Sequence, residues 1–440
     1  MQIWKNWKIL KILLIWINLC SFIQVTSSNF GNIFKDETFT PLSSISPAIS
    51  SVNSFDTLNE HDLQLINSYN SSEVLDFIAQ QINFGPRIPD TDESRLCQNW
   101  IVSKLETAAN VSLHPFSIKK GANSCSGTNI VAKINEGHEK IAIFAAHYDS
   151  RAVAEKDPNE WLRSQPIDGA NDGASGVAVL LELSQIVSQI VSQSKNKWNY
   201  EFWFIFFDAE DQGYSLGFNG LPNFEWCEGS TYMAEEMSQK PENYFSQNQS
   251  IDSIKSFILL DMVGGENLEF IQESHACPDL QEHLFNVGNH IGYGITFPLD
   301  RNSYSIIDDH VPFAQIGVPT VDLIIKFWDL SNGWPYHHTQ GDNITHISLE
   351  SLEITGKTIL YFIFFTFHPS RDIFPNGFSS PTYFQQNWPT IIIFSVGIIS
   401  VVIYGIITLI SRKKLKFRPF PKVTQENNQN KLQNKQKSKE

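Results

Sequence analysis

Four apolar runs of strand length constrain the fold of this 440-residue chain more than any other feature. They span Ile141 to Ala145, Phe202 to Phe207, Phe257 to Leu260 and Val318 to Ile325. Each run is nearly continuous rather than alternating, which is typical of strands buried on both faces of a sheet. Segments with helical spacing, such as Ser175 to Val187, separate them. The sequence therefore predicts an α/β fold: a mixed, largely parallel central sheet with helices on both faces.

Histidine and carboxylate side chains directly follow three of these runs. They are His147 and Asp149, then Asp208, Glu210 and Asp211, then Asp261. Carboxylates crowded at the end of a buried element repel one another and lose hydration, so the arrangement is costly unless a cation lies among them. Because ligands in open α/β sheets bind beyond the carboxyl ends of the strands, we expect a metal-dependent site at this edge.

Two loops supply further candidate ligands. The stretch "DGANDGASG" places Asp172 just before a helix start, where glycines permit a tight turn and the helix N-terminus favours an anion. The stretch "YHHTQGDN" supplies His337 and His338 after the fourth run. Taken alone, Asp172 is better explained as an ordinary helix cap, and a pair of loop histidines is weak evidence. These loop residues become informative when they are considered together with the strand-end residues.

Six motifs together resemble a known family. "AAHYDS", "GANDGASG", "FFDAEDQG", "ILLDMVG", "DDHVPF" and "YHHT" stand in the order and approximate spacing of the zinc-dependent M28-type exopeptidase superfamily. The resemblance covers about Phe84 to Phe365 and implies the zinc exopeptidase form of the α/β fold. This superfamily contains two-zinc aminopeptidases and one-zinc glutaminyl cyclases. Either chemistry implies zinc as the cofactor and peptide or protein N-termini as substrates.

Carried over position by position, the resemblance implies a role for each motif residue. The first zinc would have three protein ligands and a neighbouring general acid/base, which are Asp172, Asp211 and His338, with Glu210 beside them. In the two-zinc peptidases, positions matching His147 and Asp261 hold a second zinc, and Asp172 bridges. In the cyclases the same residue types persist without a second metal, and Asp261 joins a hydrogen-bond network with the catalytic glutamate. Asp208 is expected to support the strand end.

One position favours the cyclase chemistry. In "IIDDHVPF", Asp308 precedes the Asp309-His310 pair. Sequences that resemble cyclases usually carry an acid there, sharing a proton network with the catalytic glutamate, whereas the peptidases more often carry serine. The stretches "EWCEGSTYMA" and "LLDMVGGENLEF" also look like the bacterial-type cyclases. The resemblance therefore assigns Glu210, Asp261 and Asp308 to catalysis in a glutaminyl-peptide cyclotransferase. The alternatives are a two-zinc aminopeptidase and an inactive ectodomain with the M28 fold.

One position departs from the cyclase pattern. Animal-type cyclases have tryptophan directly before the last zinc-binding histidine, where this chain has His337. The departure affects the expected shape of the glutamine pocket. Aromatic residues nearby in the sequence are available to line it: Trp328, Trp334 and Tyr336.

The two ends of the chain predict export and membrane attachment. Residues 1–28 carry lysines, an apolar stretch and small polar residues, the layout of a signal segment. Residues 391–410 contain no charged residue and are long enough to span a bilayer as a helix, and basic residues follow directly. The positive-inside rule then places the catalytic domain outside the cell or in a lumen. The remaining predicted segments are a loose lead-in (29–56), the catalytic domain (57–368), a stalk (369–390) and a basic, disordered cytoplasmic tail (411–440).

Charge and cysteine content refine this picture. A formal net charge of −15 argues against nucleic acid as a partner. Beyond the signal segment the chain has four cysteines, an even number that permits disulfides in an exported domain: Cys97, Cys125, Cys227 and Cys277.

Overall fold

The computed structural model describes one compact unit that lies within Leu58–Glu440. The described residues are 58–120, 123–193, 198–215, 218–221, 224–299, 303–328, 333–370 and 377–378. The predicted signal segment, lead-in, transmembrane helix and tail lie outside the described residues, as does most of the predicted stalk.

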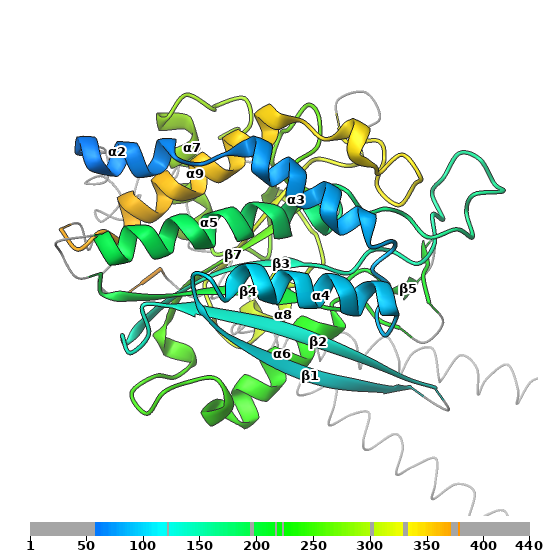
Figure 1. The fold of residues 1–440 in the computed structure, drawn as a ribbon, viewed down its shortest axis with the longest axis horizontal. Coiled ribbons are helices and arrows are strands. Elements are labelled where there is room, and N and C mark those ends of the chain that lie inside the picture. The colour runs from blue at the N-terminus through cyan, green and yellow to red at the C-terminus, as the bar shows by residue number, and fades with distance from the viewer. Residues whose placement is uncertain are drawn as a thin grey trace, which may run out of the picture. The chain divides into compact units, whose positions relative to one another are not determined.

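A six-stranded mixed sheet forms the centre of this unit, in the order β1-β2-β4-β3-β7-β10 (Figure 1). Its strands are β1 (Asn110–Lys120), β2 (Asn123–Ile134), β3 (Lys140–His147), β4 (Tyr200–Phe207), β7 (Ile254–Asp261) and β10 (Thr320–Ile324). The strands β4, β3, β7 and β10 are mutually parallel, and they correspond to the four apolar runs. β2 runs antiparallel to both of its neighbours. The predicted mixed, largely parallel sheet is therefore confirmed.

Both faces of the sheet are buried beneath helices, which explains why the strand sequences do not alternate. One set of strand side chains, including Trp203, Ile205 and Phe257, packs in a core with Met233 and Phe313. Met233 lies on α6 (Glu228–Gln239) and Phe313 on α8 (His310–Gln315). Successive strand residues point to opposite faces, so the other set faces α5 (Ala174–Gln193) and its neighbours (Figure 1).

The first turn of α5 lies unusually close to the sheet. A Cβ atom on Gly176 would come within 2.2 Å of the Leu260 carbonyl oxygen and 2.9 Å of the Ala146 Cβ, so only glycine fits there. This contact places the start of α5 against the carboxyl ends of β3 and β7. Among the described residues, α5 is one helix that is long and apolar enough to cross a bilayer. Since 78% of its apolar window is buried inside the protein, it is a core helix.

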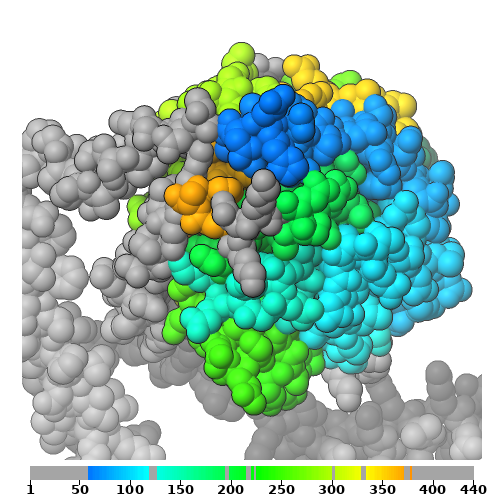
Figure 2. All heavy atoms as spheres, turned by 60° about the vertical axis from the view of Figure 1, so that its left-hand side comes forward, coloured from blue at the N-terminus to red at the C-terminus, as the bar shows by residue number. Residues whose placement is uncertain are grey.

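The N-terminal helices and the last helix cover the same side of the sheet as α5. These are α2 (Glu60–Asn67), α3 (Ser71–Asn83), α4 (Asp92–Leu105) and α9 (Leu349–Phe367). Figure 2 shows the blue N-terminal helices beside orange α9 and green α5. The Tyr69 hydroxyl donates to the Leu352 carbonyl at 3.0 Å, and the Asn70 amide donates to Glu182 at 3.2 Å. These two hydrogen bonds connect the segment between α2 and α3 to α9 and α5, which lie far from it in the sequence.

Shorter elements complete the described part of the chain. They are α7 (Pro278–His290), β5 (Tyr214–Ser215), β6 (Phe218–Asn219), β8 (Gln272–Glu273), β9 (Ser303–Tyr304), and the 3-10 helices η2 (Pro241–Asn243), η3 (Ile251–Ser253) and η4 (Ile344–His346). Cys97 and Cys227 are buried free thiols, so neither forms the disulfide that the cysteine count permits. The side chain of Cys125 lies outside the described part.

Candidate active site

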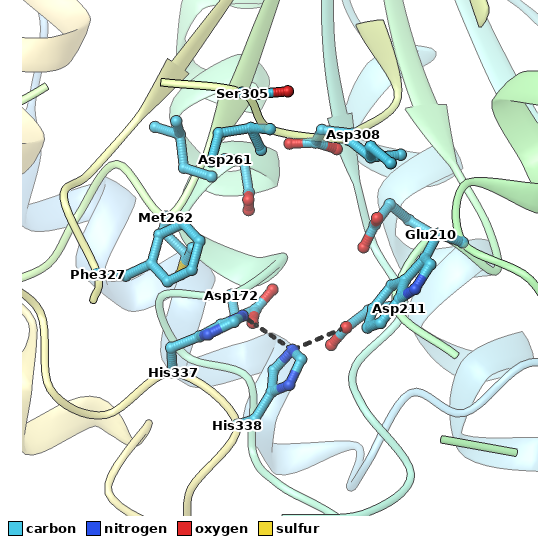
Figure 3. Close-up of a pocket in the computed structure, with 14 residues that line it drawn as sticks. Asp172, Glu210, Asp211, Asp261, Met262, Ser305, Asp308, Phe327, His337 and His338 are labelled. Carbon is cyan, nitrogen blue, oxygen red and sulfur yellow. Dashed lines mark ion pairs between the residues drawn. The ribbon is translucent and has the colours of Figure 1, made fainter. Parts of the chain in front are cut away.

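A cavity of about 340 Å³ lies at the carboxyl edge of the parallel strands (Figure 3). The residues predicted from the motifs converge on it from three strand ends and three loops. Those that line it are Asp172, Glu210, Asp211, Asp261, Asp308 and His338. His147 lies directly behind them, in contact with Asp172 and Asp261. The apolar part of the wall includes Trp226, Ile324 and Phe327.

The first group of donor atoms surrounds His338. Its Nε2 atom lies 3.1 Å from Asp211 Oδ1 and 3.9 Å from Asp172 Oδ2, and Figure 3 shows these contacts as dashed lines. The second oxygen of Asp211 is buried and has no hydrogen-bond partner in the described part of the chain. Carboxylate and imidazole groups are both zinc ligands, and a catalytic zinc typically has three protein ligands and one open position. Because an unpaired buried carboxylate oxygen is costly, this donor set fits a bound cation well.

The second group of donor atoms surrounds His147. Its Nε2 atom lies 3.2 Å from Asp172 Oδ1 and 3.2 Å from Asp261 Oδ1. Asp172 therefore presents one oxygen to each group. Burial alone lowers the pKa of His147, but the carboxylates of Asp149, Asp172 and Asp261 together raise that pKa well above its usual value. A proton on His147 can thus offset part of the negative charge of this group.

Glu210 lies apart from both groups, near Asp308. Its carboxylate, the Cys227 thiol and the Asp308 carboxylate offer atoms within 4.8 Å of one another. The Cys227 thiol donates to Glu210 Oε1 at 3.5 Å. Burial, followed by the negative charge of Asp308, raises the pKa of Glu210 well above its usual value. Burial and the charge of Asp261 raise the pKa of Asp308 to about 8. Carboxyl groups with such raised pKa values are suited to accept and return protons near neutral pH.

Further carboxylates hold the loops that carry these side chains. Asp149 accepts hydrogen bonds from the backbone amides of Glu210 and Asp211, at 3.0 and 3.1 Å. Asp342 accepts from the amides of Asn171 and Asp172, at 2.7 and 3.1 Å. Asp149 is thus a loop anchor, and Asp342 has the same role without having been singled out in the sequence.

Asp208 lies outside the cavity. Its Oδ2 atom accepts from the Thr128 amide at 3.0 Å and from the Tyr148 hydroxyl at 2.8 Å. These contacts tie the end of β4 to β2 and to the loop after β3. The structure therefore gives Asp208 the supporting position that we expected from the sequence.

Arg151 and Glu155 are site residues that the sequence reasoning missed. His338 Nδ1 lies 2.7 Å from Glu155 Oε1, and Arg151 pairs with Glu155 at 2.8 Å. Arg151 also donates to the Asp211 carbonyl at 2.7 Å. Burial raises the pKa of Glu155, but His338 and Arg151 together lower it to about 2. The ionised Glu155 therefore holds the His338 ring proton on Nδ1 and turns Nε2 towards the cavity. The acid and base four residues apart in "SRAVAE" were the available clue.

The site backbone is strained at three non-glycine residues. Ala209, Met262 and His338 have φ angles of +59°, +49° and +57°. Ala209 precedes Glu210, Met262 follows Asp261, and His338 is itself a predicted zinc ligand. Left-handed backbone at such residues costs on the order of 1 kcal/mol each and persists only where the surroundings enforce it. At Ala209, the Asp149 carboxylate that holds the amides of Glu210 and Asp211 supports this conformation.

Comparison with known proteins gives a consistent picture. Residues 129–363 match peptidase family M28. The chain is 26% identical to the glutaminyl-peptide cyclotransferase-like protein of Bos taurus over 291 residues, covering 63% of this chain and 71% of that protein. It is also similar to the solved structure of Bacteroides thetaiotaomicron glutaminyl cyclase bound to N-acetylhistamine, with 33% identity and a TM-score of 0.58. That match covers 67% of this chain and 98% of the other.

A peptidase structure is similar to nearly the same degree. It is a leucine aminopeptidase precursor from Bacteroides thetaiotaomicron VPI-5482, with 32% identity, a TM-score of 0.58, and coverage of 67% of this chain and 97% of that chain. These comparisons include both chemistries, so they do not choose between them. The family match spans more than half of the sequence, and the motif residues meet in one cavity at the predicted sheet edge. This chain therefore belongs to peptidase family M28.

Proposed function

We propose that this protein is a zinc-dependent glutaminyl-peptide cyclotransferase that converts the N-terminal glutamine of peptides to pyroglutamate and releases ammonia. One observation carries the choice: the Asp308 carboxylate lies beside the Glu210 carboxylate, within 4.8 Å, in the same buried cavity. A serine at this position would leave Glu210 without that neighbouring acid. The similarity to both cyclases and aminopeptidases supports the broader assignment to enzymes that act on peptide N-termini.

Zinc would be held by Asp172, Asp211 and His338, whose donor atoms face one another across the cavity. When bound, zinc would polarise the carbonyl group of the glutamine side-chain amide. Glu155 and Arg151 keep His338 and Asp211 oriented for this task. In the cyclase, His147 would carry a proton between Asp172 and Asp261, so that one metal suffices.

Glu210 would move the proton that the reaction must transfer. The α-amine nitrogen of the substrate attacks the side-chain amide carbon, a C–N bond forms, and the bond to the side-chain nitrogen breaks. Glu210 accepts a proton from the attacking nitrogen and returns it to the departing nitrogen, which leaves as ammonia. No external acid, base or oxidant is consumed. A raised pKa is useful here because the same carboxyl group must both accept and donate a proton.

The two-zinc aminopeptidase is the second candidate, and one observation favours it. Asp172 presents Oδ1 to His147 and Oδ2 to His338, as a carboxylate that bridges two metals would. In that enzyme His147 and Asp261 would hold the second zinc, and Glu210 would remove a proton from the attacking water.

A pair of substrates separates the two chemistries. On Gln-Phe-amide, a cyclase releases ammonia and leaves a peptide one ammonia lighter, whereas an aminopeptidase releases free glutamine. On Leu-Phe-amide a cyclase does nothing, because the substrate has no side-chain amide for its amine to attack. Asp308→Ser should reduce cyclisation strongly and leave zinc binding intact. Efficient release of leucine by the wild-type protein would overturn the cyclase assignment.

We also propose that the enzyme is a single-pass membrane protein with its catalytic domain extracellular or lumenal. The support is the uncharged stretch 391–410 with basic residues directly after it, and the signal-like residues 1–28. Tethering would keep the catalytic domain among exported peptides.

A further inference from the structure

His337 lies on the cavity wall where it could act as a fourth metal ligand. Its Nε2 atom is 3.9 Å from Asp172 Oδ2, the same oxygen that lies 3.9 Å from His338 Nε2. Asp172, His337 and His338 thus offer donor atoms within 4.8 Å of one another. With Asp211 added, four protein ligands would surround one zinc. Four protein ligands are the arrangement of a structural zinc site, and they would leave no position for substrate.

Lys156 provides a physical reason why His337 stays off the metal. Its ammonium nitrogen lies 2.7 Å from His337 Nδ1. An ammonium group can only donate, so Nδ1 accepts and the ring proton of His337 sits on Nε2. A protonated Nε2 cannot bind a metal ion. The ring is also fixed by Phe327, whose centroid lies 4.4 Å from that of His337.

The same bond turns His337 into a hydrogen-bond donor aimed at the cavity. The side chain is 12% exposed, and Asp172 Oδ2 at 3.9 Å is too distant to accept its Nε2–H. The Nε2–H group is therefore available to a substrate atom, next to the predicted zinc ligands. A neutral ring places a donor there without adding a positive charge beside the metal.

We propose that His337 is a specificity-determining residue that donates from Nε2 to the carbonyl oxygen of the substrate, and that Lys156 is the positioning residue that keeps His337 in this role and off the metal. The identity of that oxygen as the glutamine side-chain carbonyl rests on the proposed cyclase function. The division of labour between His337 and Lys156 does not, because an aminopeptidase would present a carbonyl oxygen at the same place.

Three variants of the catalytic protein test the proposal: Lys156→Met, His337→Phe and the double variant. Methionine is an unbranched side chain only one atom shorter than lysine and cannot donate, so Lys156→Met frees His337 Nδ1 and allows Nε2 to bind metal. Lys240→Met is the matched control, because Lys240 is an exposed lysine that pairs with Glu236 on α6 and does not line the cavity.

The first readout is metal binding, which requires no substrate. Zinc affinity is measured by competition with a chelator, and the ligand set by the visible absorption of the Co²⁺-substituted protein. Lys156→Met should raise metal affinity about tenfold or more, on the scale of a well-placed group near a metal, and should change the Co²⁺ spectrum. The double variant should return both to the values of His337→Phe. His337→Phe alone and Lys240→Met should match the wild type.

The second readout is turnover on whichever of Gln-Phe-amide and Leu-Phe-amide the wild type accepts. His337→Phe should lower kcat/KM about 10- to 100-fold, as expected for the loss of one hydrogen bond to a reacting carbonyl oxygen. Lys156→Met should lower it as well. A tenfold loss of zinc affinity in His337→Phe would overturn the proposal, because His337 would then be a ligand. Unchanged metal affinity and turnover in Lys156→Met would also overturn it.

Discussion

Replacing Asp308 by asparagine should make the metal-free protein more stable and much less active. The Asp308 side chain is 3% exposed, and its Oδ1 atom accepts from the Asp309 amide at 2.6 Å. Its Oδ2 atom is buried without a hydrogen-bond partner in the described part of the chain. Asparagine has the same shape, keeps the acceptor for the Asp309 amide, and replaces the unpaired oxygen by a donor amid carboxylates. The substitution therefore removes an unfavourable charge and leaves the packing of the side chain almost unchanged.

The size of the gain follows from the pKa of Asp308. Burial and the charge of Asp261 raise this pKa to about 8, against about 3.9 in the unfolded chain. Between these values the folded protein binds more protons than the unfolded chain, so its stability falls as the pH rises. At pH 7.5, the raised pKa of Asp308 lowers the free energy of unfolding by about 5 kcal/mol, because each pH unit above 3.9 contributes about 1.36 kcal/mol. Because the protonation of Asp261 and Glu210 also responds to the charge at position 308, we expect the variant to regain about half of this free energy.

Thermal unfolding of the metal-free protein measures this gain. A recovery of about 2 kcal/mol should raise the Tm by roughly 3 °C in a domain of this size at pH 7.5, and by clearly less at pH 5. Asp76→Asn, on the exposed side of α3, is the matched control and should leave the Tm within about 1 °C. Turnover of the zinc-loaded Asp308→Asn protein should fall about 100-fold or more. An equal or absent Tm gain at the two pH values would refute the reasoning about buried charge.

The other predictions test the division of roles and the topology. Glu210→Gln should retain zinc and lose turnover by about 100-fold or more, whereas Asp211→Asn should bind zinc more weakly; equal zinc loss in both would contradict the assignment. Glu155→Gln should weaken zinc binding about 10- to 100-fold, because His338 loses the partner that fixes its ring, and unchanged affinity would exclude that role. Protease added to intact cells should release the catalytic domain; cleavage confined to residues 411–440 would show the opposite orientation.

The sequence predicted the parts of the fold that depend on local patterns. The apolar runs became β3, β4, β7 and β10 because strands buried on both faces need continuous apolar residues. The strands β1 and β2 were not predicted. β1 contains Pro115, His114 and several polar residues, which an edge strand tolerates and which conceal its strand character in the sequence.

The residues of the candidate site also divide into those that local sequence patterns predicted and those that they did not. Asp261 ends one buried strand, and Glu210 and Asp211 come shortly after another, so the sheet edge that they reach could be predicted from the sequence. Glu155 could not be placed, because its partner His338 lies 183 residues away and no local pattern joins them. The left-handed backbone of His338 could not be predicted either, because histidine adopts that conformation more often than most non-glycine residues but still only uncommonly.

Titration of zinc into the metal-free catalytic protein, with ammonia release from Gln-Phe-amide as the readout, tests the central claim most directly. The Asp172, Asp211 and His338 group should bind the activating ion, while a proton on His147 serves the second group. Ammonia release should therefore reach its maximum at one zinc per chain, with pyroglutamyl-Phe-amide as the product. Activity that requires a second zinc per chain and yields free glutamine would contradict the account and identify a two-zinc aminopeptidase.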